Sequence, residues 1–151
     1  MKSEVKIEGD RVRITRVFDV PRAVVFRWWS EAEKLSQWSG CKEARNCEVE
    51  MDFRVGGGFT QKMQVGDKGS FTFTGVYEEI VEPERIVYRA NLGPAVTRVR
   101  VELFEESGGR TRMVLTQDGF PDAMMSNIVS QGTMESLEKL EAALAGAAVA
   151  R

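Results

Sequence analysis

Apolar and polar residues alternate along much of the chain, which is the pattern of half-buried β-strands. The alternation starts at Val5 and continues to Phe18, with Gly9-Asp10 as a turn or bulge inside this first strand. Six further strands follow at residues 46–53, 59–65, 71–77, 86–90, 97–103 and 111–115. The turns between them are too short for crossover helices, so this pattern predicts one antiparallel sheet.

Helical spacing replaces the alternation after Pro21, a residue that the first turn of a helix tolerates. Apolar residues then recur with the helical period at Val24, Val25, Trp28 and Trp29. The segment Ser30-Glu31-Ala32-Glu33 fits a capping box, which predicts a second short helix that runs to about Trp38 and stops at Gly40. Two short helices are therefore expected between the first two strands.

A long amphipathic helix is predicted from about Pro121 to Leu144, with Gly146 ending it. One apolar stripe follows its length: Met125, Ile128, Val129, Gly132, Leu137, Leu140 and Leu144. An antiparallel sheet with one charged face must bury its other face, and this helix is the only element able to cover it. The sequence predicts an α+β fold of the order β-α-α-β6-α, in which a curved sheet wraps around the C-terminal helix. Residues 1–151 are expected to form a single domain.

The composition excludes several kinds of chemistry. The chain of 151 residues has no histidine, which rules out histidine triads, histidine metal clusters and a histidine general base. With 21 Lys+Arg against 23 Asp+Glu, the net charge of −2 argues against binding to nucleic acid. The N-terminus has no secretory signal pattern and no apolar stretch reaches membrane-spanning length, so a cytoplasmic protein without membrane insertion is expected.

The two cysteines, Cys41 and Cys47, are too few for a disulfide scaffold or a structural zinc site. Reduced thiols without a special role are the favoured interpretation. A short-loop disulfide and a reactive thiol at Cys41 remain as alternatives.

Several motifs in the chain resemble the heat-shock protein 90 ATPase activator homologue family. The opening similarity lies in residues 16–21, followed by Val25-Phe26, Trp28-Trp29 and 35–38. Residues 55–59 and 75–88 are similar to the most recognisable segment of the family, and residues 109–112 and 119–121 resemble its close. Each motif is weak alone, but their order and spacing from about Arg11 to Leu144 are fairly specific.

This family is part of the SRPBCC superfamily, together with START-type lipid-transfer domains and birch-pollen allergens. The resemblance implies a helix-grip fold, in which a seven-stranded sheet grips the long C-terminal helix around a cavity. Two departures concern the site. Relatives often carry Gly-Trp where this chain has Gly132-Thr133, and they often follow Trp38 with a second Trp or with Gly-Pro where this chain has Ser39-Gly40. A missing aromatic ring at Thr133 widens the expected cavity or alters its ligand.

Residues predicted to face inward are rich in methionine and aromatic side chains, which suit an adaptable apolar wall. Four polar residues, Gln61, Thr97, Thr111 and Gln117, are also predicted to point inward by alternation. For each of these residues, ordinary core packing is the competing interpretation. The candidate ligand-binding residues are Phe26, Trp29, Trp38, Met51, Phe59, Met63, Phe71, Phe73, Tyr77, Tyr88, Met113, Phe120, Met125, Ile128 and Val129.

No catalytic, metal-ligating or cofactor-binding residue is predicted. Glu48, Glu50 and Asp52 fall on the solvent face of a strand, and Gly56-Gly57-Gly58 lacks the Lys and the helix of a phosphate loop. The arginines at 98, 100, 110 and 112 are expected on the outer sheet face, where nearby glutamates offset them. A small surface for an anionic partner is the alternative there.

The function predicted from the sequence is that of a small soluble binding protein for a hydrophobic or amphipathic small molecule. Two alternatives stay open: a co-chaperone-like interaction module, and an enzyme of the cyclase or hydrolase type that uses the same cavity. Either a monomer or a homodimer is compatible with the sequence.

Overall fold

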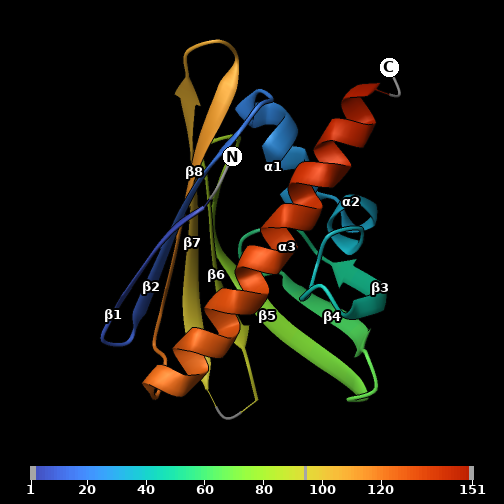
Figure 1. The fold of residues 1–151 in the computed structure, drawn as a ribbon, viewed down its shortest axis with the longest axis vertical. Coiled ribbons are helices and arrows are strands. Elements are labelled where there is room, and N and C mark those ends of the chain that lie inside the picture. Colours follow the sequence, from blue (N-terminus) through green and yellow to red (C-terminus); the bar gives the residue numbers. More distant parts are fainter. Residues whose placement is uncertain (1–2, 94, 150–151) are drawn as a thin grey trace.

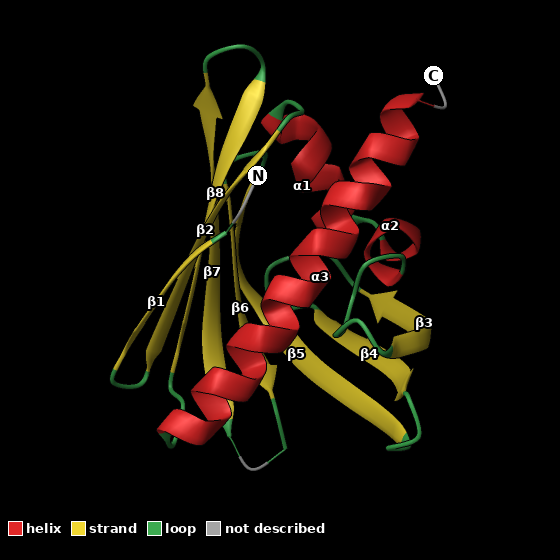
Figure 2. Ribbon diagram, viewed as in Figure 1, coloured by secondary structure: helices red, strands yellow, loops and turns green. Residues whose placement is uncertain are grey.

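A computed structural model describes residues 3–93 and 95–149 and has the α+β helix-grip architecture (Figures 1 and 2). One antiparallel sheet of eight strands has the order β1-β2-β8-β7-β6-β5-β4-β3. It curves around the long helix α3, while α1 and α2 lie together at one end. The elements are β1 (Glu4–Glu8), β2 (Arg11–Phe18), α1 (Arg22–Ser30), α2 (Ala32–Ser36), β3 (Ala44–Met51), β4 (Gly58–Val65), β5 (Ser70–Val81), β6 (Arg85–Asn91), β7 (Val96–Glu106), β8 (Arg110–Asp118) and α3 (Ala123–Val149).

The strand count of seven is wrong by one because the N-terminal segment is a hairpin. Gly9 has φ +60°, and β1 turns back to pair antiparallel with β2, with Glu8 opposite Arg11. Gly9-Asp10 is thus the turn between two strands rather than a bulge within one. The apolar positions change from odd numbers (Val5, Ile7) to even ones (Val12, Ile14) across Gly9-Asp10. A bulge within one strand and a two-residue turn between two strands both produce this shift, so the pattern does not tell them apart.

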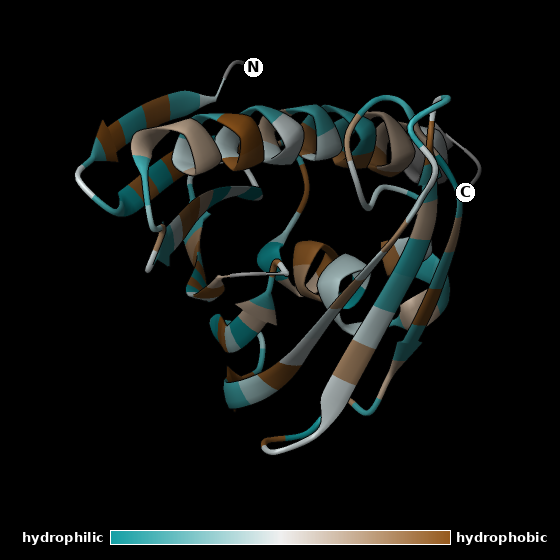
Figure 3. Cartoon of the chain, turned by 90° about the horizontal axis from the view of Figure 1, so that it is seen from below, coloured by the Kyte–Doolittle hydropathy of each residue, from teal (hydrophilic) through white to brown (hydrophobic). Residues whose placement is uncertain are grey.

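The curvature of the sheet has local causes in the strands at its far edge. Register shifts occur in β3 between Arg45 and Glu48 and in β5 between Tyr77 and Glu79. Asn46, within the first shift, has φ +53°. Such bulges bend a strand and increase its twist. The β3–β5 side of the sheet therefore swings around α3 (Figure 3).

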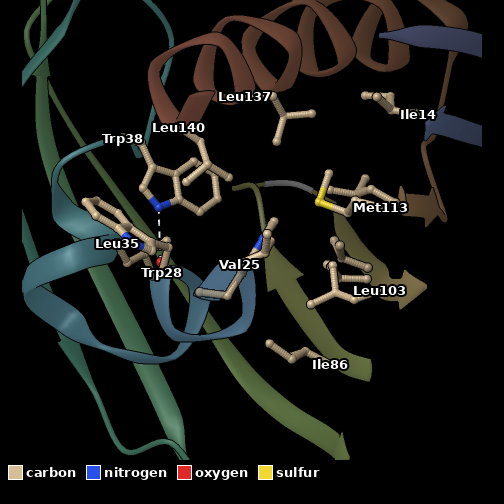
Figure 4. Close-up of a cluster of buried hydrophobic side chains, with 14 of the residues drawn as sticks. Ile14, Val25, Trp28, Leu35, Trp38, Ile86, Leu103, Met113, Leu137 and Leu140 are labelled. Atoms are coloured by element: carbon tan, nitrogen blue, oxygen red, sulfur yellow. Dashed lines mark hydrogen bonds between the residues drawn. The ribbon is translucent and has the colours of Figure 1, made fainter. Parts of the chain in front are cut away.

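The break between α1 and α2 differs from the predicted capping box. Ser30 belongs to the end of α1, and its hydroxyl donates to the Arg27 carbonyl. Glu31 is extended (φ −114°), and no side chain caps the start of α2. The second helix also ends at Ser36, earlier than predicted. A hydrogen bond from Trp38 Nε1 to the Trp28 carbonyl (3.1 Å) connects the turn after α2 back to α1 (Figure 4).

The C-terminal helix starts and ends later than predicted. Asp122 caps it, since its Oδ1 accepts the Met125 N–H at 2.8 Å. It passes through Gly146 and continues to Val149. Alanine has the highest helix propensity, so the alanines around Gly146 offset the cost of one glycine. None of the helices in the described part of the chain is long and apolar enough to cross a membrane.

The two halves of α3 differ in what they bury. In the C-terminal half Leu137, Leu140 and Leu144 are fully buried, and Figure 4 shows Leu137 and Leu140 projecting into the apolar core. In the N-terminal half Ile128 is 66% exposed, while the serines at 126 and 130 are buried. The C-terminal half therefore anchors the helix on the sheet.

Arg16 adds a polar link at the anchored end of α3. Although Arg16 is only 4% exposed, its Nη2 donates to Glu141 Oε2 at 2.9 Å. Its Nη1 donates to Ser3 at the same distance. This ion pair ties β2 to α3 and fixes the position of the helix along the strand.

Candidate functional site

A cavity of about 320 Å³ lies between the N-terminal half of α3 and the concave face of the sheet. Residues from α1, α2 and the following loop close one side, and β4 to β8 form the floor and opposite wall. Figure 3 shows α3 lying across the curved strands at this level. The cavity falls within the volume range of small-molecule sites.

The alternation of side chains along the strands determines which residues form the floor of the cavity. On β4, Phe59, Gln61 and Met63 share the inner face, and on β6 the inner residues are Tyr88 and Ala90. Their side chains enter the cavity because residues two apart on a strand point the same way.

An aromatic cluster supports this floor. The Phe59 ring packs against Tyr77 and Tyr88, with ring centroids 5.4 and 5.3 Å apart. Phe53 lies edge-on to Tyr77 at 5.0 Å. Aromatic pairs of this kind add about 0.5–1.5 kcal/mol to the burial of their surface, so the cluster stabilises this wall.

Many of the predicted ligand-binding residues do come together around the cavity. Trp29 and Trp38 pack edge to face, with ring centroids 4.7 Å apart, and form the wall on the side of α1 and α2. Ile128 lies at the mouth, where its side chain is largely exposed. The predicted residues in the lining are Trp29, Trp38, Phe59, Met63, Phe73, Tyr88, Ile128 and Val129.

The other predicted residues lie outside the lining. Phe71 is 42% exposed near the hairpin between β4 and β5, beyond the part of the sheet that α3 covers. Met125 is half-buried on α3, one turn before Val129. Periodicity along a strand or a helix identifies the face on which a residue lies and not its depth along the element, which is why both positions are among the predicted ones. The remaining members pack in the core: Phe26, Met51, Tyr77, Met113 and Phe120.

Several lining residues were not among the predicted ones. Val99 and Leu115 line the floor, and the alternation of their strands already placed both inward. Among strand residues the prediction favoured methionine and aromatic side chains, and it included aliphatic residues only from the C-terminal helix. Leu35, Leu92 and Cys41 come from helix and loop segments, where no strand period identifies the inner face.

The predicted inward-facing polar residues divide between two places. Gln117 lines the cavity, and its Nε2 donates to Thr97 Oγ1 at 2.8 Å. Thr97 is buried and is not itself part of the lining. Gln61 also lines the cavity. Thr111 is buried elsewhere, and its hydroxyl donates to the Val20 carbonyl at 2.7 Å. Hydrogen bonding thus satisfies Thr111 in the core, whereas Gln61 and Gln117 line the cavity and Thr97 accepts a hydrogen bond from Gln117.

Among the residues that the structure describes, no charged side chain lines the cavity. Lys139 lies nearby, but its Nζ donates to the carbonyls of Ser39 and Cys41 at 2.8 and 3.2 Å. Burial lowers the pKa of Lys139, and burial raises the pKa of the Cys47 thiol. Both cysteines are free thiols.

The described residues contain no group of three or more His, Cys, Asp or Glu side chains able to hold a metal ion. A cavity of this chemistry can bind and orient a molecule by apolar contact and a few hydrogen bonds.

Alkaline pH is expected to destabilise the protein through its buried tyrosines. Burial raises the pKa of Tyr77 and of Tyr88 above the ordinary value of 10.0. Their stabilising contribution is complete below pH 10 and is lost as the pH rises toward the raised folded-state values, because the unfolded chain ionises first. The free energy of unfolding should fall by about 1 kcal/mol per tyrosine between pH 10 and 11. Urea unfolding at each pH measures this fall.

The control is the double variant Tyr77→Phe/Tyr88→Phe. The lowered pKa of Lys139 acts in the opposite direction, since it makes stability increase with pH up to the ordinary value of 10.5. Because the double variant keeps Lys139, the difference between the two proteins isolates the tyrosines. Equal pH dependence in both proteins would contradict this prediction.

A second hollow, of about 540 Å³, lies on the outer face of β1, β2, β7 and β8. Arg98 and Arg100 are on this face as predicted, but acidic residues are interspersed with the basic ones. Arg98 pairs with Glu78 at 2.8 Å, while Arg112 pairs with Glu106 at 3.9 Å. This mixed-charge face has the character of a solvated surface.

Comparison with protein families gives one match that spans most of the chain. Residues 19–145 match the family model described as Activator of Hsp90 ATPase homolog 1-like protein. No match was found among curated proteins.

Solved structures share the fold over nearly their whole length. A Chromobacterium violaceum protein is 26% identical, with a TM-score of 0.78 over 88% of this chain and 95% of that one. A Nitrosomonas europaea protein is 22% identical, with a TM-score of 0.83 over 95% and 99%. An HSP90 activator from Plasmodium falciparum is 24% identical, with a TM-score of 0.72 over 91% and 97%.

Proposed function

The chain belongs to the Activator of Hsp90 ATPase homolog 1-like family, and from this premise we propose that it is a small binding protein for a hydrophobic or amphipathic molecule. The ligand occupies the cavity between the sheet and α3. The observation that carries the proposal is a hollow of about 320 Å³ whose described lining residues include no charged side chain. Burial of apolar ligand surface there supplies about 25 cal/mol per Å² before entropic costs.

The form of α3 also supports this proposal. Near the cavity α3 carries Val129, Gly132 and Thr133, which fill less space than the leucines further along the helix. A protein core without a ligand is ordinarily packed to crystal-like density. Small residues at this position preserve a space that larger ones would fill.

Native mass spectrometry of the protein purified from its own host tests the proposal most directly. A retained small molecule of reproducible mass is the expected result. Titration with apolar compounds, followed by the fluorescence of Trp29 and Trp38 in the cavity wall, is the second measurement. No retained molecule and no saturable response to any apolar compound would overturn the proposal.

Replacing Thr133 with tryptophan is expected to weaken apolar ligand binding by at least about 30-fold, which corresponds to ~2 kcal/mol. Thr133 is half-buried in the cavity wall, so a large ring there fills the space that the ligand needs. Calorimetric titration with an apolar probe that binds the unmodified protein measures the loss.

Gln131→Trp is the matched control for this substitution. Gln131 is exposed on the same helix and does not line the cavity. Binding should stay within about twofold of the unmodified protein, a difference of less than ~0.5 kcal/mol. If Thr133→Trp binds the probe as well as the control does, the ligand does not occupy this cavity.

A chaperone partner is the second candidate, and family membership is the observation in its favour. The family description names an activator of the Hsp90 ATPase, and the Plasmodium falciparum relative is itself an HSP90 activator. Stimulation of the ATPase of the chaperone from the same organism by the purified protein is the test. Unchanged ATPase activity and no complex in a size-exclusion experiment would remove this candidate.

A further inference from the structure

Gln117 at the cavity floor forms a hydrogen bond with Thr97, and the second hydrogen bond of Thr97 shows which of the two residues donates. The Thr97 hydroxyl has one proton, and Oγ1 donates it to the Ala90 carbonyl at 3.4 Å. Toward Gln117, 2.8 Å away, the same oxygen can therefore only accept. The side-chain amide of Gln117 presents its NH₂ group to Thr97, so its oxygen points the other way.

The other end of that amide is an unused acceptor. Gln117 Oε1 accepts no hydrogen bond from the described residues. It is also absent from the polar atoms that are sealed from solvent without a partner, which among the described side chains are Arg16 Nε, Arg22 Nε and Trp29 Nε1. Gln117 is only 6% exposed and lines the cavity, so this oxygen is reached from the cavity.

A second polar group lies in the same cross-strand row. Tyr88 on β6 is opposite Val99 on β7, and Val99 is opposite Gln117 on β8. All three residues line the cavity, and no described residue forms a hydrogen bond with the Tyr88 hydroxyl. Because burial raises its pKa, Tyr88 stays protonated and neutral. The floor thus offers neutral hydrogen-bonding groups separated by one valine.

The lining opposes charged ligands. A carboxylate or ammonium group brought into the cavity loses its hydration and meets no charge of opposite sign among the described lining residues. A neutral polar group loses far less, and a donor regains a hydrogen bond at Gln117 Oε1.

We propose that the cavity selects an uncharged, mainly apolar molecule whose hydroxyl or N–H group donates a hydrogen bond to Gln117 Oε1. This inference rests on the proposed binding function and adds the chemical class of the ligand. Gln117 is then a specificity-determining residue, and the Thr97 hydroxyl is a positioning group that holds the amide in its orientation.

Three probes with one ring system test the proposal in calorimetric titrations: 2-naphthol, 2-methoxynaphthalene and 2-naphthoate. The first has a donor, the second has an acceptor only, and the third is an anion. We expect 2-naphthol to bind about fivefold more tightly than 2-methoxynaphthalene, the usual gain from one neutral hydrogen bond. We expect 2-naphthoate to bind at least about 100-fold more weakly than 2-naphthol.

The variant Gln117→Leu removes the acceptor while Thr97 keeps its bond to the Ala90 carbonyl, so no donor loses its partner. The preference for 2-naphthol over 2-methoxynaphthalene should fall to about one. Thr111→Val is the matched control, because Thr111 is a buried polar residue of the same strand and lies outside the cavity lining. It should keep the preference of the unmodified protein.

The possible outcomes separate this inference from the function on which it rests. If none of the three probes binds the folded protein, the proposed binding function itself fails at this site. If 2-naphthoate binds as tightly as 2-naphthol, or if Gln117→Leu keeps the preference, apolar binding stands and the ligand class is wrong. Should Gln117→Leu fail to fold, equal affinities of the unmodified protein for 2-naphthol and 2-methoxynaphthalene still overturn the proposal.

Discussion

Truncation of Leu140 to alanine is expected to lower the free energy of unfolding by about 3–5 kcal/mol. Leu140 is 0% exposed and projects from α3 into the core, near Trp38 in Figure 4. Its removal costs the transfer free energy of the lost atoms plus that of the hole left behind. Equilibrium unfolding in urea, followed by circular dichroism, measures the change.

Ile128→Ala on the same helix is the matched control. Ile128 is 66% exposed at the mouth of the cavity, so its truncation should cost less than about 1 kcal/mol. The comparison tests whether the C-terminal half of α3 holds the helix on the sheet. Similar losses for the two variants would show that both halves contribute equally and would contradict this description of the fold.

Gly75→Ala is expected to destabilise the protein by about 3 kcal/mol. A Cβ atom at this position would lie 2.3 Å from ring atoms of Phe59 and 2.3 Å from the Arg89 carbonyl oxygen. The ring can shift only by disturbing its contacts with Tyr77 and Tyr88, and the carbonyl belongs to the neighbouring strand β6. The midpoint temperature of thermal unfolding and the affinity for an apolar probe should both decrease.

A suitable control is Gly58→Ala, one strand away. The Cβ atom there would meet only the Gly75 carbonyl oxygen at 3.4 Å, an ordinary contact. We expect a change of less than about 1 kcal/mol in the free energy of unfolding. If Gly75→Ala is as stable as this control, the close packing of Phe59 over Gly75 is not a feature of the protein in solution.

Much of the fold could be predicted from the chain because alternation and helical periodicity are strong local signals. These signals located the strand regions, the two short helices and α3. They also placed Thr97 and Gln117 on the inward face of the sheet, where both are buried. The errors lie at the turn between β1 and β2 and at the ends of the helices. Ser30 fits a capping box, yet its hydroxyl donates within α1 because the chain bends at Glu31. Helix-start motifs compete with tertiary packing, and packing is not visible in sequence.

The candidate site was harder to predict than the fold. Periodicity assigns a residue to a face, but membership of the cavity depends on how far the sheet bends away from α3. Phe71 and Phe73 share a face of β5, and only Phe73 reaches the lining. The orientation of the Gln117 amide depends on the Thr97–Ala90 hydrogen bond across two strands, which no local pattern encodes.

The two halves of α3 have different roles, since one half anchors the helix in the core and the other half borders the cavity. Leucines at positions 137, 140 and 144 are buried in the core, while Val129 and Thr133 are partly buried and line the cavity. Changes on the cavity-facing turns therefore leave the anchoring turns untouched. A scaffold of this kind can acquire new ligands through small substitutions on the cavity-facing turns of α3, at little risk to folding.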